Sequence, residues 1–421
     1  MAQKKNIITY VSLVHEDIIP GIRAYGKRTK QKFRVMLIRD IKQKHSPVPS
    51  DLDIFIECDF SKPETITTEL LPYMDEMLAI SCRSESHMEL FAKIIPHVPY
   101  LRTPTAESIH WATDKLAMRK RLRIFDKKGT PVFTVVRENS KKERVRIAEK
   151  VGFPLIIKPT NLAQSMLVSI CYHEEEFEKT LTKAFQKIQK IYEERKYERP
   201  PTIIAERFMD GDMYSIDAYV TARGKVYTCP IIKVLTSRSR GREDFSNYLH
   251  TTVHQLKKAS IERAEKTVEL AVRALGLRST TVHVELMKVD DDWRIIEVGP
   301  RVGGYRHKLY KLGYGFDHSI NDILIRIPQK PVISKKIKAY ATVLKYYPDK
   351  EGIITELKGI KKIQELASFD SIVIHKKIGD RSRFATSGGG AVFNVTLANK
   401  DRAKLLADVR RVEQLVQITV K

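Results

Sequence analysis

The fold of this chain is decided by the stretch His283–Gly304, HVELMKVDDDWRIIEVGPRVGG. Two short apolar runs flank the three aspartates at 290–292, which predicts two antiparallel strands joined by a tight turn. A turn centred on Asp291 would place Glu285 directly opposite Glu297 on one face of the hairpin. The predicted cross-strand pairs, counted outward from the turn, are Val289–Trp293, Met287–Ile295 and Glu285–Glu297.

Two opposed glutamates repel each other unless they share a proton or bind a cation. Ligand sets made only of oxygen favour a hard cation, and Mg²⁺ usually arrives with substrate phosphates. Arg301 follows Glu297 by four residues, and Gly303 and Gly304 then allow close approach of a backbone. The hairpin alone favours this metal site no more than a surface hairpin with two solvated acids.

Length, charge and cysteine usage limit the class of protein. The chain has 421 residues, which predicts several domains of about 100–200 residues each. Its formal charge of +24 attracts anions such as nucleotides, acidic substrates or nucleic acid. The four cysteines are scattered and suggest a reducing cytoplasm. No apolar run approaches the ~20 residues of a membrane span.

The first 110 residues alternate apolar strands with helical stretches, a pattern typical of a parallel sheet built from βαβ units. No G-x-G-x-x-G follows the first strand, so the dinucleotide fingerprint is absent. We therefore predict a small Rossmann-like domain without its own cofactor. The predicted strands are IITYVSLV, FRVMLIRD, LDIFIEC and EMLAISCRS.

Charged residues in the middle of the chain lie at the ends of predicted elements. A helix is predicted over residues 114–125, with Lys115 near its start. Lys158 ends the buried strand in FPLIIKPT and can point into a cleft. Glu206 closes another strand, and the Arg207–Met209 backbone after it can present N–H and C=O groups to a purine. An exposed helical lysine and a bare strand–turn–strand are the alternatives.

Taken together, these pieces resemble the ATP-grasp superfamily of ligases over nearly the whole chain. The resemblance rests on a small N-terminal α/β domain followed in family order by TDKLAMRKRL, FPLIIKP, IIAERFMDGDMYS, VHVELMKV and IIEVGPRVGG. The HVEL strand, the GPRVGG segment and the small mixed domain after it are most similar to the L-amino acid ligase group.

The resemblance implies an α/β and α+β fold. A Rossmann-like pre-ATP-grasp domain (1–110) would precede an ATP-grasp domain (111–328) whose two α+β subdomains grip ATP. Its small lid would cover about 154–208 and its large subdomain about 209–328. A mixed α/β domain would fill 329–421, after the boundary marked by Pro328 and Pro331.

The resemblance also implies roles for individual residues. Lys115 and Lys158 would contact phosphates, and Glu206 would lie at the adenine hinge. Glu285 and Glu297 would bind Mg²⁺ or Mn²⁺, and Arg301 would hold the transferred phosphate or acyl-phosphate. The expected catalytic residues are Arg301, Glu297 and Lys158. The expected residues for the nucleotide and its metal are Lys115, Lys158, Glu206, Phe208, Asp212, Glu285 and Glu297.

Three positions depart from the family pattern. Gly299 replaces an asparagine that supplies a metal oxygen, and Met213 replaces an acid that reaches the ribose, for which neighbouring Asp212 could substitute. The phosphate loop at 161–166, NLAQSM, contains no glycine. These departures concern metal binding, nucleotide choice and turnover more than the fold.

The sequence therefore predicts a cytoplasmic, ATP-dependent carboxylate–amine ligase that forms an amide bond through an acyl-phosphate and releases ADP and phosphate. Its expected partners are a small carboxylate and a small amine, such as amino acids. A membrane partner is not expected, and a homodimer is left open. Two alternatives remain: a degenerate nucleotide-binding protein with little turnover, and a nucleic-acid-binding protein motivated only by the basic charge.

Overall fold

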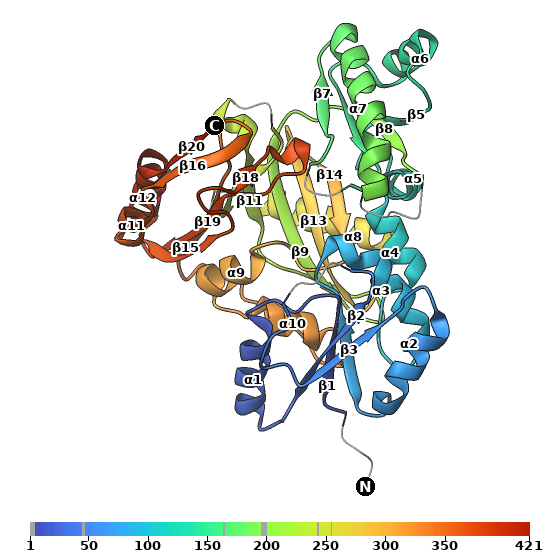
Figure 1. Ribbon diagram of the computed structural model, residues 1–421, viewed down its shortest axis with the longest axis vertical. Coiled ribbons are helices and arrows are strands. Elements are labelled where there is room, and N and C mark those ends of the chain that lie inside the picture. The colour runs from blue at the N-terminus through green and yellow to red at the C-terminus, as the bar shows by residue number, and fades with distance from the viewer. Residues whose placement is uncertain (1–4, 44–46, 163–164, 195–199, 242–243, 254) are drawn as a thin grey trace.

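The computed structural model describes residues 5–43, 47–162, 165–194, 200–241, 244–253 and 255–421. Figure 1 shows the N-terminal part at the bottom, the green strands and helices around α7 at the upper right, and the C-terminal part on the left. The middle of the molecule is a large sheet that contains both strands of the predicted hairpin.

The N-terminal part contains four parallel strands in the order β3-β2-β1-β4, which confirms the predicted parallel sheet. The strands β1, β2 and β4 are almost entirely buried because helices cover the sheet, whereas the edge strand β3 exposes Phe55 and Glu57. The order places the carboxyl ends of the adjacent strands β1 and β4 at a topological switch point, where α/β sheets commonly bind ligands. The elements are β1 (Ile7–Val11), α1 (Ile18–Thr29), β2 (Arg34–Asp40), β3 (Ile54–Cys58), α2 (Pro63–Leu70), β4 (Met77–Ser81), α3 (Met88–Ile94) and α4 (Ala106–Thr113).

A four-stranded antiparallel sheet in the order β5-β8-β6-β7 follows the helix α5 (Lys115–Phe125). Its long helix α7 buries Phe177, Leu181, Ala184 and Ile188, a helical spacing that gives one apolar face toward the sheet. The sheet includes β5, which precedes the lid boundary expected at residue 154. Its elements are β5 (Phe133–Val136), α6 (Lys141–Val151), β6 (Leu155–Pro159), β7 (Ser169–Cys171), α7 (Glu174–Glu194) and β8 (Ile203–Arg207).

The large sheet has nine strands, in the order β14-β13-β9-β11-β12-β15-β19-β17 with β10 paired to β9. The strands β15, β19 and β17 come from the C-terminal part, so the sheet runs through the boundary expected at residue 328. The elements up to that boundary are β9 (Asp212–Val220), β10 (Val226–Thr228), β11 (Ile232–Thr236), β12 (Asn247–Thr252), α8 (Lys258–Ala274), β13 (Thr280–Val289), β14 (Asp292–Gly299), α9 (Arg306–Tyr314) and α10 (His318–Leu324).

The two faces of the large sheet have different coverings. On one face Tyr214, Ile216 and Ala218 of β9 pack against α8, the helix that buries the main hydrophobic core. Successive side chains of a strand point to opposite faces, so Ser215 and Asp217 lie on the other face. This second face carries the polar residues described below.

The C-terminal part adds helices and short strands to the edge of the large sheet. Strands are present in AYATVLKYY, SIVIHKK and AVFNVTLA, and a helix follows them, while β18, β16 and β20 form a second small sheet. The elements are β15 (Tyr340–Tyr346), β16 (Gly352–Lys358), α11 (Ile360–Gln364), β17 (Phe369–Ile374), β18 (Arg381–Ser382), β19 (Phe393–Asn399), α12 (Arg402–Leu415) and β20 (Gln417–Val420).

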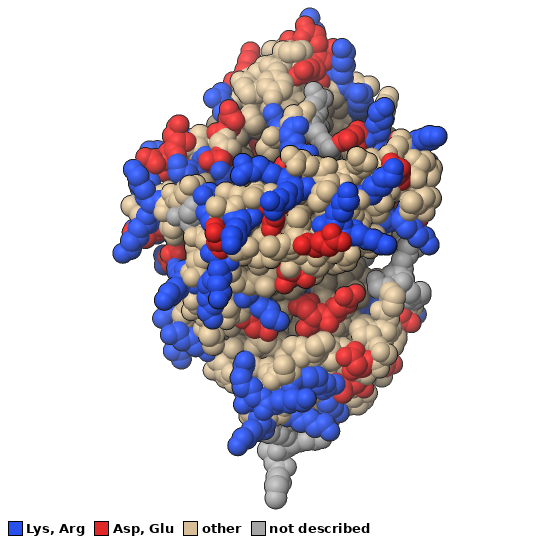
Figure 2. All heavy atoms as spheres, turned by 90° about the vertical axis from the view of Figure 1, so that its left-hand side faces the viewer, with Lys and Arg blue, Asp and Glu red and all other residues tan. Residues whose placement is uncertain are grey.

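Surface charge is distributed as the sequence suggests. Figure 2 shows lysine and arginine spread over one whole face, while acidic side chains gather in its hollowed middle. All four cysteines are buried and free, in agreement with the predicted lack of disulfides. Within the described ranges, no helix has the length and apolar character needed to cross a membrane.

Candidate functional site

The hairpin of β13 and β14 places Glu285 opposite Glu297, as predicted, and it also places His283 opposite Gly299. The register nearer the turn was predicted wrongly: Val289 pairs with Asp292, and Met287 pairs with Arg294. A two-residue turn closes the hairpin, and an irregularity between Glu285 and Leu286 leaves Ile296 as an extra residue in β14. A bulge of this kind shifts the register by one residue, which restores the opposed glutamates.

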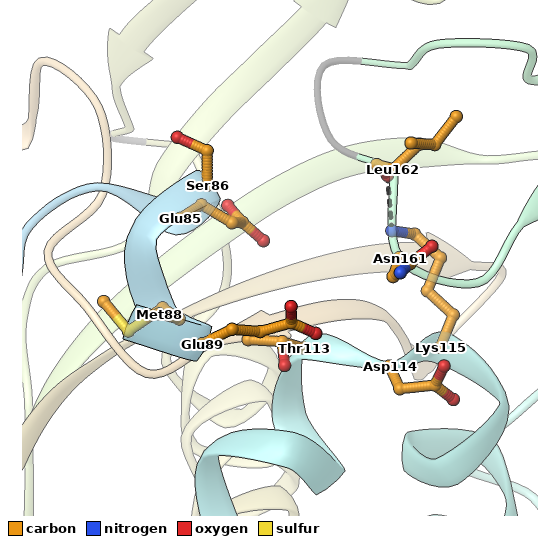
Figure 3. Close-up of a pocket in the computed structure, with 9 residues that line it drawn as sticks. All are labelled: Glu85, Ser86, Met88, Glu89, Thr113, Asp114, Lys115, Asn161 and Leu162. Atoms are coloured by element: carbon orange, nitrogen blue, oxygen red, sulfur yellow. Dashed lines mark hydrogen bonds between the residues drawn. The ribbon is translucent and has the colours of Figure 1, made fainter. Parts of the chain in front are cut away.

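Lys115 lies beside Glu297. Asp114 caps the helix α5 by accepting a hydrogen bond from the Ala117 N–H, which brings the Lys115 side chain inward at the first turn. The Lys115 Nζ donates to the Leu162 carbonyl oxygen at 3.0 Å, drawn in Figure 3, and to Glu297 Oε1 at 3.2 Å. Burial disfavours the ammonium, but the nearby carboxylates, Glu297 foremost, outweigh burial and raise the Lys115 pKa.

Lys158 and Arg119 hold the carboxylate of Glu206. The Lys158 Nζ lies 2.7 Å from Glu206 Oε2, and Arg119 binds both Glu206 oxygens at 2.8 and 3.1 Å. The other Arg119 N–H groups donate to the carbonyls of Ile295 and Ile296, where the bulge turns β14. All three charged side chains are buried, so a network of ion pairs connects α5, the four-stranded antiparallel sheet and the large sheet.

Burial and charge act in opposite directions on this network. Burial alone would raise the Glu206 pKa, but Arg119 and Lys158 lower it to about 2. Burial lowers the Lys158 pKa to about 8, with Glu206 opposing that shift and Arg119 adding to it. At neutral pH Glu206 is therefore a carboxylate, and Lys158 carries most of its charge.

Because Glu206 has a lower pKa folded than the ordinary 4.5, we expect it to stabilise the protein above about pH 4.5. The stabilisation should disappear as the pH falls toward 2, since the unfolded chain takes up the proton first. The shift corresponds to roughly 3 kcal/mol. Urea unfolding of the wild type and Glu206→Gln between about pH 5 and pH 3 tests it, with exposed Glu262→Gln as control. Equal loss of stability in wild type and Glu206→Gln would contradict the expectation.

Arg301 lies at the edge of a pocket that the N-terminal part helps to form. Its guanidinium pairs with Glu85, which follows β4 at the topological switch point, and it also donates to the Val302 carbonyl oxygen at 3.0 Å. Figure 3 shows Glu85 and Glu89 on one side of the pocket and Asp114 and Lys115 on another. The pocket is lined by Glu85, Ser86, Met88, Glu89, Thr113, Asp114, Lys115, Asn161 and Leu162.

Behind the glutamates lies a buried chain of polar groups centred on Asp217. Asp217 Oδ1 contacts His283 Nδ1 at 2.6 Å, and Oδ2 contacts His318 Nε2 at 2.8 Å. Oδ2 also accepts the Gly303 N–H at 2.7 Å, which anchors the glycine turn after Arg301. Burial would raise the Asp217 pKa, but the two histidines hold it well below the usual range.

The backbone that follows Glu206, expected to contact a purine, already has hydrogen-bond partners within the protein. The N–H groups of Arg207 and Phe208 already donate to the carbonyls of Val132 and Pro154, so they are not available to a base. Phe208 is half-buried, with the Arg238 guanidinium 5.3 Å from its ring. Asp212 is exposed and pairs with Lys233 at 3.1 Å. The purine contact expected from this backbone therefore cannot use those two N–H groups in the conformation seen here.

The carboxylate oxygens of Glu285 and Glu297 are donors that suit Mg²⁺. Among the described residues, no group of three or more His, Cys, Asp or Glu side chains is arranged to hold a metal. Mg²⁺ is commonly bound by one or two carboxylates plus substrate phosphates, so the opposed pair Glu285 and Glu297 is sufficient in kind. The cations Lys115, Lys158 and Arg301 each pair with a carboxylate; the two lysines are buried and Arg301 is half-buried.

Comparison with known proteins agrees with this arrangement. Residues 151–308 match the model of the ATP-grasp domain family. The alanine–anticapsin ligase of Bacillus subtilis is 23% identical over 317 residues, which cover 72% of this chain and 65% of the relative. The carbamoyl phosphate synthase large chain of Thermus thermophilus is 27% identical over 204 residues, 48% of this chain and 18% of that protein.

Solved structures match over the full length. The L-amino acid ligase from Bacillus licheniformis has a TM-score of 0.82 at 17% identity, covering 100% of both chains. The N5-carboxyaminoimidazole ribonucleotide synthetase from Thermotoga maritima has a TM-score of 0.70 at 13% identity, covering 99% of this chain and 100% of its own. The chain thus has the ATP-grasp fold, arranged over its whole length as in these solved structures. Within that fold, residues 151–308 match the ATP-grasp domain family.

Several residues of the site were missed from the sequence. The sequence contained a sign that Arg119 is buried. It lies four residues after Lys115 and between Met118 and Leu122, so it shares the inner face of α5 with them. Asp217 could have been recognised as well, because it is an acid in the middle of a strand whose neighbouring residues are buried. Glu85 had no such sign beyond its place after a strand of a parallel sheet.

Proposed function

We propose that the protein is an ATP-dependent carboxylate–amine ligase. The observation that carries the proposal is the opposed pair Glu285 and Glu297 with the cations Lys115, Lys158 and Arg301 near it. Such a site suits phosphoryl transfer, in which catalysis is mainly positioning and neutralisation of charge.

The reaction would give an acyl-phosphate and ADP from a carboxylate and ATP, after which an amine displaces phosphate. Mg²⁺ held at this site would supply positive charge to neutralise the charge that develops during phosphoryl transfer. Glu285 and Glu297 would hold the metal, and Lys115 and Lys158 would bind phosphate oxygens. Arg301 would bind the transferred group through its planar fork of N–H donors.

Each of these cations already has a carboxylate partner. Lys115 contacts Glu297, Lys158 contacts Glu206, and Arg301 contacts Glu85. A metal that takes Glu297 frees Lys115 for a phosphate oxygen, so metal and nucleotide binding would favour each other. The carboxylates thus keep the cations ordered until the phosphates arrive.

The substrates can be found by measuring ADP release with pairs of amino acids and small carboxylic acids, in Mg²⁺ and in Mn²⁺. We expect ADP release to require one carboxylate and one amine together, and mass spectrometry should detect their amide. Binding of Mg·ATP without ADP release for any pair would instead support a degenerate nucleotide-binding protein, the alternative that Gly299 favours.

Substitution of Gly299 by asparagine is expected to tighten Mg·ATP binding, by about tenfold. Gly299 is the last residue of β14 and does not have a positive φ. An added Cβ would make only ordinary contacts, 3.5–3.7 Å from the Arg301 guanidinium, so the backbone accepts a side chain. The asparagine oxygen could then join the shell that Glu285 and Glu297 begin.

Calorimetric titration of Mg·ATP into the wild type and Gly299→Asn measures this effect. Gly390→Asn is the control, because that glycine also lacks a positive φ and its Cβ would meet nothing within 4 Å. Unchanged or weaker binding by a folded Gly299→Asn protein would remove position 299 from the metal site.

A further inference from the structure

Four positions form a square on one face of the hairpin. His283 is opposite Gly299, and Glu285 is opposite Glu297, two residues along each strand. Directly opposed side chains in an antiparallel pair have Cβ atoms roughly 4.5–5.5 Å apart. One corner of the square has no side chain of its own, because it is glycine, so His283 faces a position without a side-chain ligand beside the two carboxylates, with the Arg301 guanidinium next to it.

The His283 ring is held in one orientation from behind. Its Nδ1 lies 2.6 Å from Asp217 Oδ1, and Asp217 is itself fixed by His318 and the Gly303 N–H. Asp217 accepts the proton on Nδ1, and a metal bound at Nε2 would take the place of the proton that the Glu285 carboxylate otherwise favours there. The Nε2 is directed toward Glu285, 3.5 Å from its Oε1.

This arrangement matches the way in which proteins hold a metal-binding histidine. Such a histidine almost always donates its second ring N–H to a carboxylate or carbonyl, which fixes the tautomer and the ring. His283 has that carboxylate in Asp217 and has a glutamate next to its other nitrogen. The Lys345 ammonium also acts on Glu285 from β15, and Arg306 lies 4.0 Å from Asp217.

We propose that His283 Nε2 is a nitrogen ligand of the metal ion that Glu285 and Glu297 bind, and that it makes the site prefer Mn²⁺ to Mg²⁺. The proposal rests on the proposed function, because it concerns the same ion. Imidazole suits transition metals, whereas Mg²⁺ is bound almost entirely by oxygen. The nitrogen would compensate for the oxygen that glycine at position 299 cannot supply.

The site would be completed only when the ion arrives. At present Glu297 contacts Lys115 at 3.2 Å, and the described residues hold no preformed three-residue metal cluster. Entry of the ion with its phosphates would draw Glu297 away from Lys115 and toward Glu285. His283 is already oriented, so it needs the least movement of the three.

Pulsed electron paramagnetic resonance of the wild-type protein with Mn·ATP tests the ligand directly. We expect ¹⁴N modulation from a directly bound nitrogen, and we expect ¹⁵N-labelled protein with unlabelled ATP to lose it. Labelling separates a protein nitrogen from those of the nucleotide. A folded protein that binds Mn·ATP with no protein-nitrogen coupling would overturn the proposal and leave the proposed function standing.

Variants then assign the nitrogen to His283. His283→Asn retains a donor for Asp217 but removes Nε2, so we expect it to lose the ¹⁴N signal. It should also weaken Mn·ATP binding about 10–100-fold, with a smaller effect on Mg·ATP. The control is His97→Asn, in the N-terminal part, where the ring contacts Thr67. Persistence of the signal in His283→Asn would overturn the assignment.

A second variant separates metal preference from general damage. Adding Gly299→Asn to His283→Asn supplies an oxygen at position 299, so Mg·ATP binding should recover while the nitrogen signal stays absent. If the double variant also recovers the preference for Mn²⁺ over Mg²⁺, nitrogen ligation by His283 is not the cause of that preference. If the folded wild type binds neither Mg·ATP nor Mn·ATP, both this proposal and the proposed function are wrong.

Discussion

Replacement of Glu297 by glutamine is expected to lower metal-dependent ADP release by about three orders of magnitude, equivalent to roughly 4 kcal/mol of transition-state stabilisation. Glutamine has the same shape but no charge, so the opposed pair would contain a single carboxylate. The substitution would also remove the carboxylate that contributes most to raising the Lys115 pKa.

The fold should survive this change. The Glu297 side chain is 25% exposed, and glutamine can still accept the hydrogen bond that Lys115 donates. Steady-state ADP release and thermal unfolding should therefore separate activity from stability. The matched control is Glu262→Gln, which neutralises an exposed surface pair with Lys258 at 3.9 Å. A Glu297→Gln protein with the wild-type rate would rule out a role for this carboxylate in binding a catalytic metal.

Substitution of Arg119 by methionine is expected to destabilise the protein by roughly 3–5 kcal/mol. Arg119 is fully buried, and it binds both oxygens of Glu206 and the carbonyls of Ile295 and Ile296. Methionine fills part of the volume, but the buried Glu206 carboxylate would then have Lys158 as its remaining charged partner. The carbonyls of Ile295 and Ile296 would lose the hydrogen bonds that Arg119 donates.

Equilibrium unfolding in urea measures the effect, with Arg123→Met as control. Arg123 lies four residues further along the same helix and is exposed, so its loss should change stability by no more than about 0.5 kcal/mol. The Arg119 variant should also weaken nucleotide binding, because Arg119 orders the Glu206 carboxylate that Lys158 contacts. Equal stability of the two variants would contradict the structural role of Arg119.

The sequence was sufficient for much of the local structure. The N-terminal parallel strands and the helix that begins near Lys115 were predicted because burial of apolar residues imposes a regular spacing. The opposed glutamates were also predicted, although the pairs near the turn were wrong. Two compensating irregularities, a shorter turn and a bulge, leave no trace in a simple alternating pattern.

The contacts between distant segments could not be predicted. Glu85 and Arg301 are 216 residues apart, and Lys115 and Glu297 are 182 residues apart. Local propensity and hydrophobic period carry no information on which charged groups meet after the sheets have packed. The buried Asp217 with its two histidines is another case, because a polar residue in a strand shows only that some partner is needed.

By itself, the sequence determined the order of elements, the facing carboxylates and the resemblance to ATP-grasp ligases, since these depend on residues close together or on motifs in a fixed order. Only the tertiary structure decided how each cation is paired, that the large sheet continues into the C-terminal part, and that His283 lies against Asp217 beside Gly299. These features depend on the packing of segments far apart in the chain, where burial makes every charge require a partner.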